Sequence, residues 1–477
     1  MSSLTWSRRT PIGAEVVATP EQGVHVRVWT PGAKDVSIII ESDSREVPLV
    51  VDDQGYASGF ISGLAERALY RFRVDGNEIP DPASRFQPQG PFGPSQVVDP
   101  DHFAWTDKAW KGIAADRHVI YEMHIGTFTR AGTWLAACKQ LAFLAQLGVT
   151  TIEVMPVNEF AGDHGWGYDG VDLFAPHAKY GEPADFRHFV DHAHALGLAV
   201  ILDVVYNHLG PAGNFLPREF RHKEKANDWG ESIDFSVAQV REFYIANAVA
   251  WISEYHLDGL RFDATQAIHD ETILAETITA CRAAAPHRQL WMVAENEPQE
   301  ARLVREQGFD ALWNDDFHHS ARVATTGVVD GYLHDYDGSA RELVAALRHG
   351  FLYQGQVYPW QAGTRGTSAR DLPRTAFVHF LENHDQTANL GFGERLHQLT
   401  DPGKLRAMTA VLLLGPSIPM LFQGQETGST RPWEFFCGHT GELGDAVRKG
   451  RAEFMAQFER FALPAARAAR RDPIAQS

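Results

Sequence analysis

Residues 259–263 read Gly-Leu-Arg-Phe-Asp and close a short apolar run that starts at His256. The run lies between two stretches with helical periodicity, which predicts a buried β-strand ending at Asp263. Side chains alternate along a strand with a period of two, so Arg261 and Asp263 lie on the same face. The guanidinium stabilises the charged form of the carboxyl, and we expect Asp263 to be ionised at neutral pH. By itself such a pair is more often structural than functional, so its meaning depends on the rest of the chain.

The chain after residue 118 alternates between short apolar runs and longer amphipathic stretches. The predicted strands are residues 118–126, 149–156, 198–206, 257–263, 290–295, 311–314, 376–381 and 417–422. Helical patterns between them include residues 133–147, 185–196, 237–255, 271–284 and 402–414. This alternation predicts a (β/α)8 barrel, whose catalytic groups lie at the carboxyl ends of the strands. A doubly wound open sheet is the alternative, but no Gly-x-Gly-x-x-Gly follows the first strand.

Residues 1–107 have a different pattern and predict a separate N-terminal domain. Short β runs at residues 24–29, 36–40, 46–51 and 68–74 are separated by Gly, Pro and Asp turns. Such runs are typical of a β-sandwich of immunoglobulin-like size. The Pro- and Gly-rich residues 80–94 should form an extended connector that lies against another part of the protein. We therefore expect two domains, the sandwich with its connector at 1–107 and the barrel at 108–477.

Composition and charge exclude several classes of function. The 477 residues are 44% hydrophobic and 22% charged, as in ordinary globular proteins, and carry a net charge of −18. Nucleic acids and anionic membranes require clustered positive charge, so neither is expected as a partner. Cys138, Cys281 and Cys437 show no metal-type spacing, and a disulfide framework is not expected. No run reaches the length of a membrane span or resembles a signal peptide, which predicts a cytoplasmic protein.

Three acidic residues follow predicted strands of the barrel. Asp263 ends the fourth strand, Glu295 ends the fifth, and Asp385 follows the seventh. The carboxyl ends of barrel strands meet on one rim, so these side chains should converge. Glycoside cleavage requires one ionised carboxylate that attacks or stabilises the sugar cation and one protonated carboxyl that protonates the leaving oxygen. A retaining enzyme holds the two about 5 to 5.5 Å apart, which neighbouring strands can supply.

Four segments at these strand ends resemble the α-amylase family of glycoside hydrolases. They are Asp203-Val-Val-Tyr-Asn-His208, Gly259-Leu-Arg-Phe-Asp263, Val293-Ala-Glu295 and Asn383-His-Asp385. The resemblance implies that Asp263 is the nucleophile, Glu295 the general acid and base, and Asp385 the stabiliser of the transition state. It also implies that the sugar at the cleaved bond is surrounded by Tyr168, Asp203, His208, Arg261 and His384.

Within this family the likeness is closest to the malto-oligosyltrehalose trehalohydrolases, and it covers nearly the whole chain. It includes Glu122-Met-His-Ile-Gly-Thr-Phe128, His164-Gly-Trp-Gly-Tyr-Asp-Gly170 and Trp313-Asn-Asp-Asp-Phe-His-His319. The implied activity is retaining hydrolysis of the α-1,4 bond next to the terminal trehalose of maltooligosyltrehalose, and the implied partner is this oligosaccharide or another α-glucan. The likeness adds further substrate-binding residues: Asp315, Asp316, His318, His319, Gln386 and Asn389. It also implies that the sandwich resembles a glucan-binding module.

Two other functions stay open on the sequence. A 1,4-α-glucan branching enzyme has the same sandwich, barrel and carboxylates but is a transferase. Gln386 follows Asp385 where branching enzymes usually have Glu, which favours the hydrolase. A non-catalytic glucan-binding protein is the second alternative, and the retained carboxylates count against it because clustered like charges are costly.

No cofactor and no metal ion are expected. Asp203 and the neighbouring Asn207-His208 could indicate calcium, but a hard cation needs six or more oxygen ligands and no others are evident. The family usually continues with a last barrel helix and a small C-terminal β domain, which this sequence lacks or replaces with a charged helix over residues 443–461. An incomplete eighth unit would expose apolar surface, which predicts a shortened chain, compensation by that helix, or association. The oligomeric state is not predicted.

Overall fold

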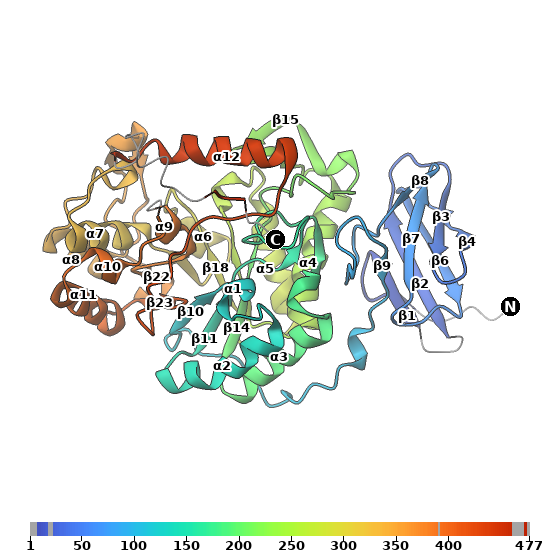
Figure 1. Ribbon diagram of the computed structural model, residues 1–477, viewed down its shortest axis with the longest axis horizontal. Helices are drawn as coiled ribbons and strands as arrows, with labels where there is room; N and C mark the ends of the chain where they lie inside the picture. Colours follow the sequence, from blue (N-terminus) through green and yellow to red (C-terminus); the bar gives the residue numbers. More distant parts are fainter. Residues whose placement is uncertain (1–6, 18–21, 390–391, 460–471, 475–477) are drawn as a thin grey trace.

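The computed structural model describes residues 7–17, 22–389, 392–459 and 472–474, and its larger part is a closed barrel of eight parallel strands (Figure 1). In barrel order the strands are β10 (Ile120–Met123), β11 (Thr151–Val154), β14 (Ala199–Val204), β17 (Gly259–Phe262), β18 (Trp291–Ala294), β19 (Ala311–Trp313), β22 (Phe377–Phe380) and β23 (Ile418–Phe422). Each strand lies within one of the eight predicted runs, which confirms the (β/α)8 barrel.

Helices surround the barrel on its outside. The outer helices are α2 (Trp134–Leu147), α3 (Pro183–Ala195), α4 (Ala238–Glu254), α5 (Thr272–Ala284), α6 (Arg302–Glu306), α7 (Asp315–Thr326), α8 (Ala340–His349) and α11 (Pro402–Leu414). Short helices occur in the connections, namely α1 (Ile125–Phe128), α9 (His384–Ala388) and α10 (Leu396–Leu399). The five helices predicted between the barrel strands are present, and their ends differ from the prediction by at most two residues.

The strands form where the sequence is apolar on both faces. All six residues of β14, Ala-Val-Ile-Leu-Asp-Val, are buried, as expected for a parallel strand between a barrel interior and a layer of helices. Inward side chains such as Ile201, Val293 and Phe380 form a core inside the barrel. The parallel register pairs Asp203 of β14 with Arg261 of β17. A buried acid and a buried base are therefore neighbours near the carboxyl ends of two strands.

Three antiparallel hairpins lie in the connections between the strands. They are β12 (Asn158–Glu159) with β13 (Asp172–Pro176), β15 (Arg221–Asn227) with β16 (Gly230–Ile233), and β20 (Gln356–Tyr358) with β21 (Gly363–Arg365). Each connection starts from the carboxyl end of a barrel strand, which is the end where catalytic groups lie in this fold. These hairpins therefore supply side chains to the rim.

The N-terminal part contains two antiparallel sheets, as predicted for a sandwich (Figure 1). One sheet has the order β1 (Gly13–Val17), β2 (Gly23–Trp29), β6 (Tyr56–Ser62), β5 (Val50–Val51). The other has the order β4 (Arg45–Pro48), β3 (Val36–Ile40), β7 (Leu69–Val74), β8 (Asn77–Ile79), with β9 (Ser95–Gln96) also paired to β7. A common core that includes Val26, Ile38 and Phe72 joins both sheets.

The connector at residues 80–94 lies against both parts of the protein. Asp81 is fully buried and accepts a hydrogen bond from the Tyr70 hydroxyl of the sandwich at 2.6 Å. Arg85 reaches the barrel, where its Nη2 donates to Glu254 Oε1 of α4 at 3.0 Å. The predicted packing of this segment is confirmed, because its polar side chains bridge the two parts.

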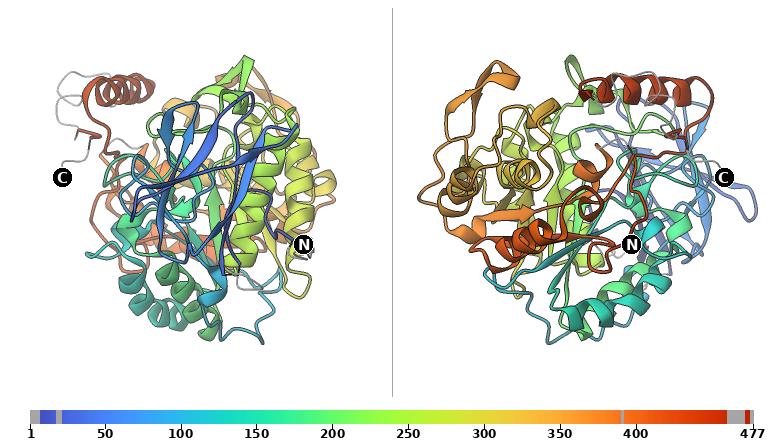
Figure 2. Two further views of the ribbon diagram at one scale, coloured as in Figure 1. Left: turned by 90° about the vertical axis from the view of Figure 1, so that its right-hand side faces the viewer. Right: turned by 60° about the vertical axis from the view of Figure 1, so that its left-hand side comes forward.

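The chain after β23 leaves the ring of outer helices. Helix α12 (Gly441–Met455) lies over the carboxyl-end side of the barrel, and in all three views it is far from α2 (Figures 1 and 2). It corresponds to the helix predicted over residues 443–461, although it starts earlier, at Gly441, and ends earlier, at Met455. Residues 460 and 461 lie outside the described part. Among the described residues, no strand follows β23.

Helix α12 does not cover the apolar surface where an eighth outer helix would pack. On α2, Leu135, Phe143 and Leu147 are exposed, and on α11 Leu414 is 84% exposed. Helix α2 follows β10, and helix α11 precedes β23. The two helices therefore lie on either side of the place where an eighth outer helix would pack. The predicted apolar exposure is present. Of the three alternatives predicted with it, compensation by a C-terminal helix does not describe α12, because Arg451 of that helix contacts Asn389 and Ala388 on the rim.

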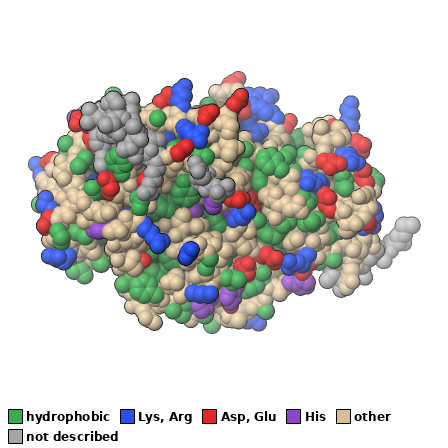
Figure 3. All heavy atoms as spheres, in the orientation of Figure 1, with side chains coloured by type: hydrophobic (Ala, Val, Ile, Leu, Met, Phe, Trp, Pro, Cys, Tyr) green, Lys and Arg blue, Asp and Glu red, His purple; other side chains and the backbone are tan. Residues whose placement is uncertain are grey.

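The surface and the cysteines agree with the composition. On the face shown in Figure 3, Lys and Arg side chains are interspersed with Asp and Glu. Cys138, Cys281 and Cys437 are free thiols in buried positions. Across the described parts of the chain, no helix is both long enough and apolar enough to cross a bilayer.

A buried ion-pair network below β17 should make a large contribution to stability. His194 Nδ1 contacts Asp107 Oδ2 and Nε2 contacts Asp258 Oδ2, both at 2.9 Å, and the two carboxylates raise the pKa of His194 against the opposing effect of burial. The His194→Ala variant leaves both acids without this partner and should lower the free energy of unfolding by about 3 kcal/mol in urea denaturation. His188→Ala, on the exposed face of the same helix, is the control and should change stability by less than about 0.5 kcal/mol. Equal effects would contradict the prediction.

Candidate active site

Arg261 is the centre of an acidic cluster at the carboxyl ends of β14, β17 and β18. Its guanidinium is fully buried, and Nη1 donates to Asp203 Oδ2 at 2.6 Å and to Asp263 Oδ1 at 2.9 Å. Its Nη2 forms an ion pair with Glu295 Oε2 at 2.8 Å. The other face of the guanidinium is covered by Trp313, whose ring centroid lies 4.1 Å from Cζ. One cation therefore holds three carboxyl groups from three neighbouring strands.

The two acids expected to perform the chemistry have further partners that hold their positions. Asn207 Nδ2 donates to Asp263 Oδ2 at 3.1 Å, and the backbone N–H of Ala264 donates to Glu295 Oε2 at 2.9 Å. Ala264 adopts a left-handed conformation with φ of 38°, which is uncommon for a residue with a side chain. This local strain places the N–H directly after Asp263 where it can contact the acid on the next strand.

Burial raises the pKa of both Asp263 and Glu295, an effect that the sequence did not predict. Desolvation raises the pKa of Asp263 to about 6 and that of Glu295 to about 7, while Arg261 acts in the opposite direction on both. Asp385 contributes to both increases. Arg261 lowers the pKa of Asp263, as expected from the sequence, but the cost of burying the charge is the larger effect. At neutral pH Asp263 is still mostly ionised, and Glu295 is partly protonated.

Tyr168 links the acidic cluster to His384. Its hydroxyl donates to Asp203 Oδ2 at 2.6 Å and lies 2.8 Å from His384 Nε2. The two rings are stacked with centroids 5.2 Å apart. His384 Nε2 also lies 3.5 Å from Asp385 Oδ2, the third expected catalytic acid, whose side chain is 41% exposed. The structure thus brings Tyr168, Asp203, His384 and Asp385 together, and Asp385 is the most accessible of them.

His208 and Trp229 form one side of the site. His208 Nδ1 contacts Asn207 Oδ1 at 2.7 Å, and Nε2 contacts the carbonyl oxygen of Tyr168 at 2.9 Å. Trp229 stacks on the imidazole with centroids 5.2 Å apart, and half of its surface is exposed. Trp313 is 3% exposed and packs against Arg261. Trp229 therefore has a face free for a ligand, whereas Trp313 does not.

The predicted substrate-binding residues of α7 are Asp315, Asp316, His318 and His319. Some of them lie at the rim and others in the core. Asp315 is partly exposed, and burial raises its pKa to about 7. Asp316 is fully buried and accepts hydrogen bonds from Tyr336, Gln299 and the backbone N–H of Tyr353. The expectation that Asp316 contacts sugar is therefore corrected, because its oxygens are used to hold surrounding loops.

The two histidines of the same helix are buried beside each other. His318 Nδ1 and His319 Nδ1 are 3.0 Å apart, and the exposed fractions of the two residues are 3% and 4%. Burial lowers the pKa of His318 to about 3 and that of His319 as well. At neutral pH they are uncharged parts of the wall behind the rim. In this arrangement neither offers a charge to a ligand.

Gln386 and Asn389 lie on and just after α9, next to the catalytic rim. The hydroxyl of Tyr332 donates to Gln386 Oε1 at 2.5 Å, and Arg451 of α12 donates to Asn389 Oδ1 at 3.2 Å. His439, just before α12, contacts Asp169 Oδ2 at 2.9 Å. Helix α12 is thus anchored on two sides of the rim, which makes it part of the surroundings of the site.

Two charged residues of the site were not found from the sequence. Glu122 of β10 is 1% exposed and binds His384, and Arg365 of β21 pairs with Glu297 and Asp316. An acid within an apolar strand was the available signal for Glu122. Arg365 lies in an irregular segment without periodicity, and no local pattern marks it. Among the described residues, no group of three or more His, Cys, Asp or Glu side chains could hold a metal ion.

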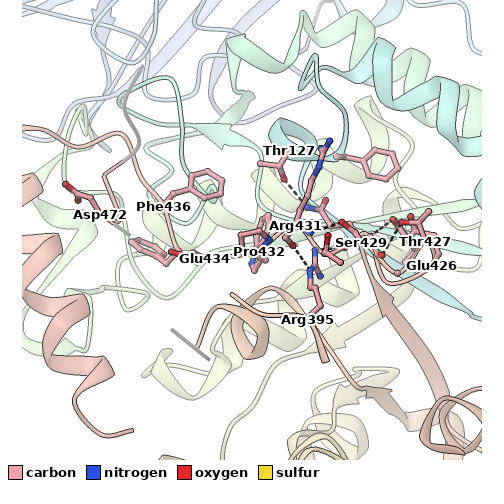
Figure 4. Close-up of a pocket in the computed structure, with 18 residues that line it drawn as sticks. Thr127, Arg395, Glu426, Thr427, Ser429, Arg431, Pro432, Glu434, Phe436 and Asp472 are labelled. Carbon is pink, nitrogen blue, oxygen red and sulfur yellow. Dashed lines mark hydrogen bonds between the residues drawn. The ribbon is translucent and has the colours of Figure 1, made fainter. Parts of the chain in front are cut away.

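A cavity of about 790 Å³ is lined by the loop that follows β23 (Figure 4). Its lining includes Arg395, Glu426 and Trp433 but none of the three expected catalytic acids. Arg395 donates to the carbonyl oxygens of Arg431 and Gln423, which holds this loop in place. Trp433 separates the cavity from the site, and its Nε1 donates to the carbonyl oxygen of His384 at 2.8 Å.

Comparison with known proteins identifies the family. Residues 11–100 match the model of carbohydrate-binding module 48 (isoamylase N-terminal domain), and residues 97–233 match the α-amylase catalytic domain. A malto-oligosyltrehalose trehalohydrolase from Deinococcus radiodurans is 40% identical over 449 residues, which are 92% of this chain and 74% of the relative. The chain belongs to the malto-oligosyltrehalose trehalohydrolase family, within the α-amylase enzymes.

Two further proteins resemble this chain to different extents. A solved structure of a candidate α-amylase from Salmonella typhimurium is 41% identical, has a TM-score of 0.89, and covers 94% of this chain and 78% of its own. A 1,4-α-glucan branching enzyme from Pseudoalteromonas atlantica is 32% identical over 283 residues, which are 52% of this chain and 39% of the relative. The likeness to trehalohydrolases thus extends over much more of the chain than the likeness to branching enzymes.

Proposed function

We propose that the chain hydrolyses the α-1,4 bond next to the terminal trehalose of maltooligosyltrehalose and releases trehalose. The observation that carries the chemistry is the shared contact of Asp263 and Glu295 with Arg261, at 2.9 and 2.8 Å. The pKa of Asp263 is raised to about 6 and that of Glu295 to about 7, so one acid is ionised and the other retains protons in the same pH range. This is the division of roles that a glycosidase requires.

In the proposed reaction, a carboxylate oxygen of Asp263 attacks the anomeric carbon and forms a covalent bond to the sugar. The bond from this carbon to the bridging oxygen breaks, and Glu295 transfers its proton to that oxygen, so trehalose leaves as an alcohol. Glu295, now ionised, removes a proton from water, and the resulting oxygen displaces Asp263 from the anomeric carbon. Both acids return to their initial states, and the anomeric configuration is retained because the carbon is inverted twice.

The remaining side chains of the site bind the sugar and its developing charge. Asp385 is exposed and next to His384, which supports a role in binding ring hydroxyls and stabilising the transition state. Tyr168 and Trp229 provide aromatic surface, and His208 borders the same space. The N-terminal residues 1–107 are proposed to bind the glucan chain, which is supported by the match of residues 11–100 to a carbohydrate-binding module.

Product analysis tests the function directly. The protein is incubated separately with maltotriosyltrehalose and with amylose, and the products are separated by anion-exchange chromatography. Free trehalose and maltotriose from the first substrate, with no new α-1,6 linkages from the second, support the hydrolase. New branches in amylose would identify a transferase instead. Binding of either glucan without any product would favour a binding protein.

The rate should have a bell-shaped dependence on pH with a maximum between about pH 6 and pH 7. Below the pKa of Asp263, about 6, the nucleophile is protonated and kcat/KM should fall. Above the pKa of Glu295, about 7, the acid has lost its proton and kcat/KM should fall again. Asp263 and Glu295 are close and titrate as a pair. The two limbs of the pH profile therefore report pKa values of the pair and not of either residue alone. Initial rates on maltotriosyltrehalose measure the profile, and a plateau from about pH 4 to pH 9 would contradict it.

A further inference from the structure

Two carboxyl groups lie side by side in the barrel below the proposed catalytic acids. Glu122 of β10 is in register with Glu153 of β11, and each is 1% exposed. Both oxygens of Glu122 bind His384, since Oε1 accepts from Nδ1 at 2.5 Å and Oε2 accepts from the backbone N–H at 3.0 Å. Neither oxygen of Glu153 has a hydrogen-bond partner among the described residues. The two glutamates are equally buried but differ in their contacts, because only Glu122 binds His384.

The hydrogen bonds around His384 provide an acceptor for a proton on each ring nitrogen. A carboxylate can only accept, so Nδ1 must donate to Glu122. The hydroxyl hydrogen of Tyr168 is used on Asp203 at 2.6 Å, so this oxygen can only accept from Nε2, which lies 2.8 Å away. These are the contacts that an imidazolium makes, with Nδ1 donating to Glu122 and Nε2 donating to the Tyr168 oxygen.

Burial alone would remove this charge, as another histidine of the same region illustrates. His124 is fully buried, has uncharged partners, and its pKa is lowered to about 4 by desolvation. For His384 desolvation also lowers the pKa, but Asp385 and Glu122 together outweigh it and raise the pKa to about 9. Of these two acids, Glu122 is the one that contacts the ring and the backbone at hydrogen-bond distance.

Charged and titratable groups reach His384 from several elements. Glu122 and Asp385 favour the charged imidazole, and Arg261 of β17 opposes it. Asp203 of β14 contacts the same Tyr168 hydroxyl, and His124 and Glu153 are also within electrostatic range. Burial, together with the neighbouring Glu122, raises the pKa of Glu153 far above its usual value, which opposes a charge on this carboxyl.

We propose that Glu122 is a positioning residue that keeps His384 as an imidazolium and fixes the first residue of the helix that carries Asp385. The charged ring then lies 3.5 Å from the Asp385 carboxylate and stacks on Tyr168. A cation at this place limits the movement of the Asp385 side chain while it binds the sugar. The role of Glu122 in the reaction rests on the proposed function, whereas the charge of His384 does not.

Histidine-selective ¹⁵N labelling followed by NMR titration tests the proposal in the chain of 477 residues. The His384 signals are assigned by their loss in His384→Gln. In the unmodified protein both ring nitrogens should be protonated at about pH 7.5, since the ordinary pKa of a histidine is about 6.5. In Glu122→Gln the pKa of His384 should fall by about 1 to 3 units because its charged partner is removed. A neutral His384 in the unmodified protein would overturn the proposal, even if the variant does not fold.

Glu153→Gln is the matched control, because it removes a neighbouring carboxyl that does not bind His384. It should leave the His384 titration unchanged, and Glu122→Asp, which keeps the charge, should restore a pKa close to the original. An equal shift in Glu153→Gln and Glu122→Gln would overturn the proposal. So would a Glu122→Gln variant whose His384 stays charged up to about pH 9.

The kinetics of Glu122→Gln distinguish a positioning role of Glu122 from a general structural role. In Glu122→Gln the kcat on maltotriosyltrehalose, relative to the unmodified protein, should fall by about tenfold between pH 6 and pH 8, because His384 loses its charge in this range. KM should change much less. An unchanged ratio across this range would contradict the proposed role. The unmodified protein could fail to cleave this substrate while its His384 is an imidazolium that depends on Glu122. In that case the proposed function is wrong, and the assigned charge of His384 is still correct.

Discussion

The Asp263→Asn variant should lose about four orders of magnitude in kcat while it still binds the oligosaccharide. Asn has the same shape as Asp, but its amide oxygen is too weak a nucleophile to form the bond to the anomeric carbon. Arg261 keeps Asp203 and Glu295 as partners, so the arrangement of the site should persist. Release of trehalose measures kcat, and calorimetric titration with maltotriosyltrehalose measures the affinity.

Asp163→Asn is the control for this variant, because Asp163 is an exposed acid in the segment that precedes Tyr168, where it pairs with Lys179. It should change kcat by less than about twofold, since surface ion pairs contribute little. If Asp263→Asn retains more than about a tenth of the original kcat, Asp263 is not the nucleophile. If it loses turnover and affinity together with thermal stability, the effect is on the fold.

The Glu295→Gln variant should lose about three orders of magnitude in kcat on maltotriosyltrehalose but much less on α-maltosyl fluoride. Fluoride leaves without a proton, so the loss of the general acid matters little for bond cleavage. With the natural substrate the leaving oxygen needs the proton that Glu295 supplies. Comparison of the two substrates therefore isolates the step in which Glu295 acts.

The pH dependence supplies a second criterion for this residue. With α-maltosyl fluoride, Glu295→Gln should lack the decrease above about pH 7 and keep the decrease below about pH 6, because Asp263 remains. Glu297→Gln, a nearby acid that pairs with Arg365, is the matched variant and should keep both limbs. Equal losses on the two substrates would show that Glu295 has another role.

Much of the fold could be predicted because its signals are local. The apolar runs at residues 198–206 and 257–263 are long enough to mark buried strands, and each barrel strand lies inside a predicted run. Helix α11 ends at the predicted residue, Leu414, and Gly415 and Pro416 follow it. The position of α12 was not predicted, since its charged pattern is compatible with several packing sites.

The sequence by itself determined that Asp263, Glu295 and Asp385 stand at the carboxyl ends of strands, because strand periodicity is a property of neighbouring residues. Only the tertiary structure decided their ionisation and their partners. Glu122 and His384 are 262 positions apart, and no local pattern connects them. Asp315 and Asp316 are adjacent, yet the first faces the rim and the second is buried, because successive residues of a helix point in different directions. Burial and long-range contact depend on the packed chain, and these two properties set the charges of the site.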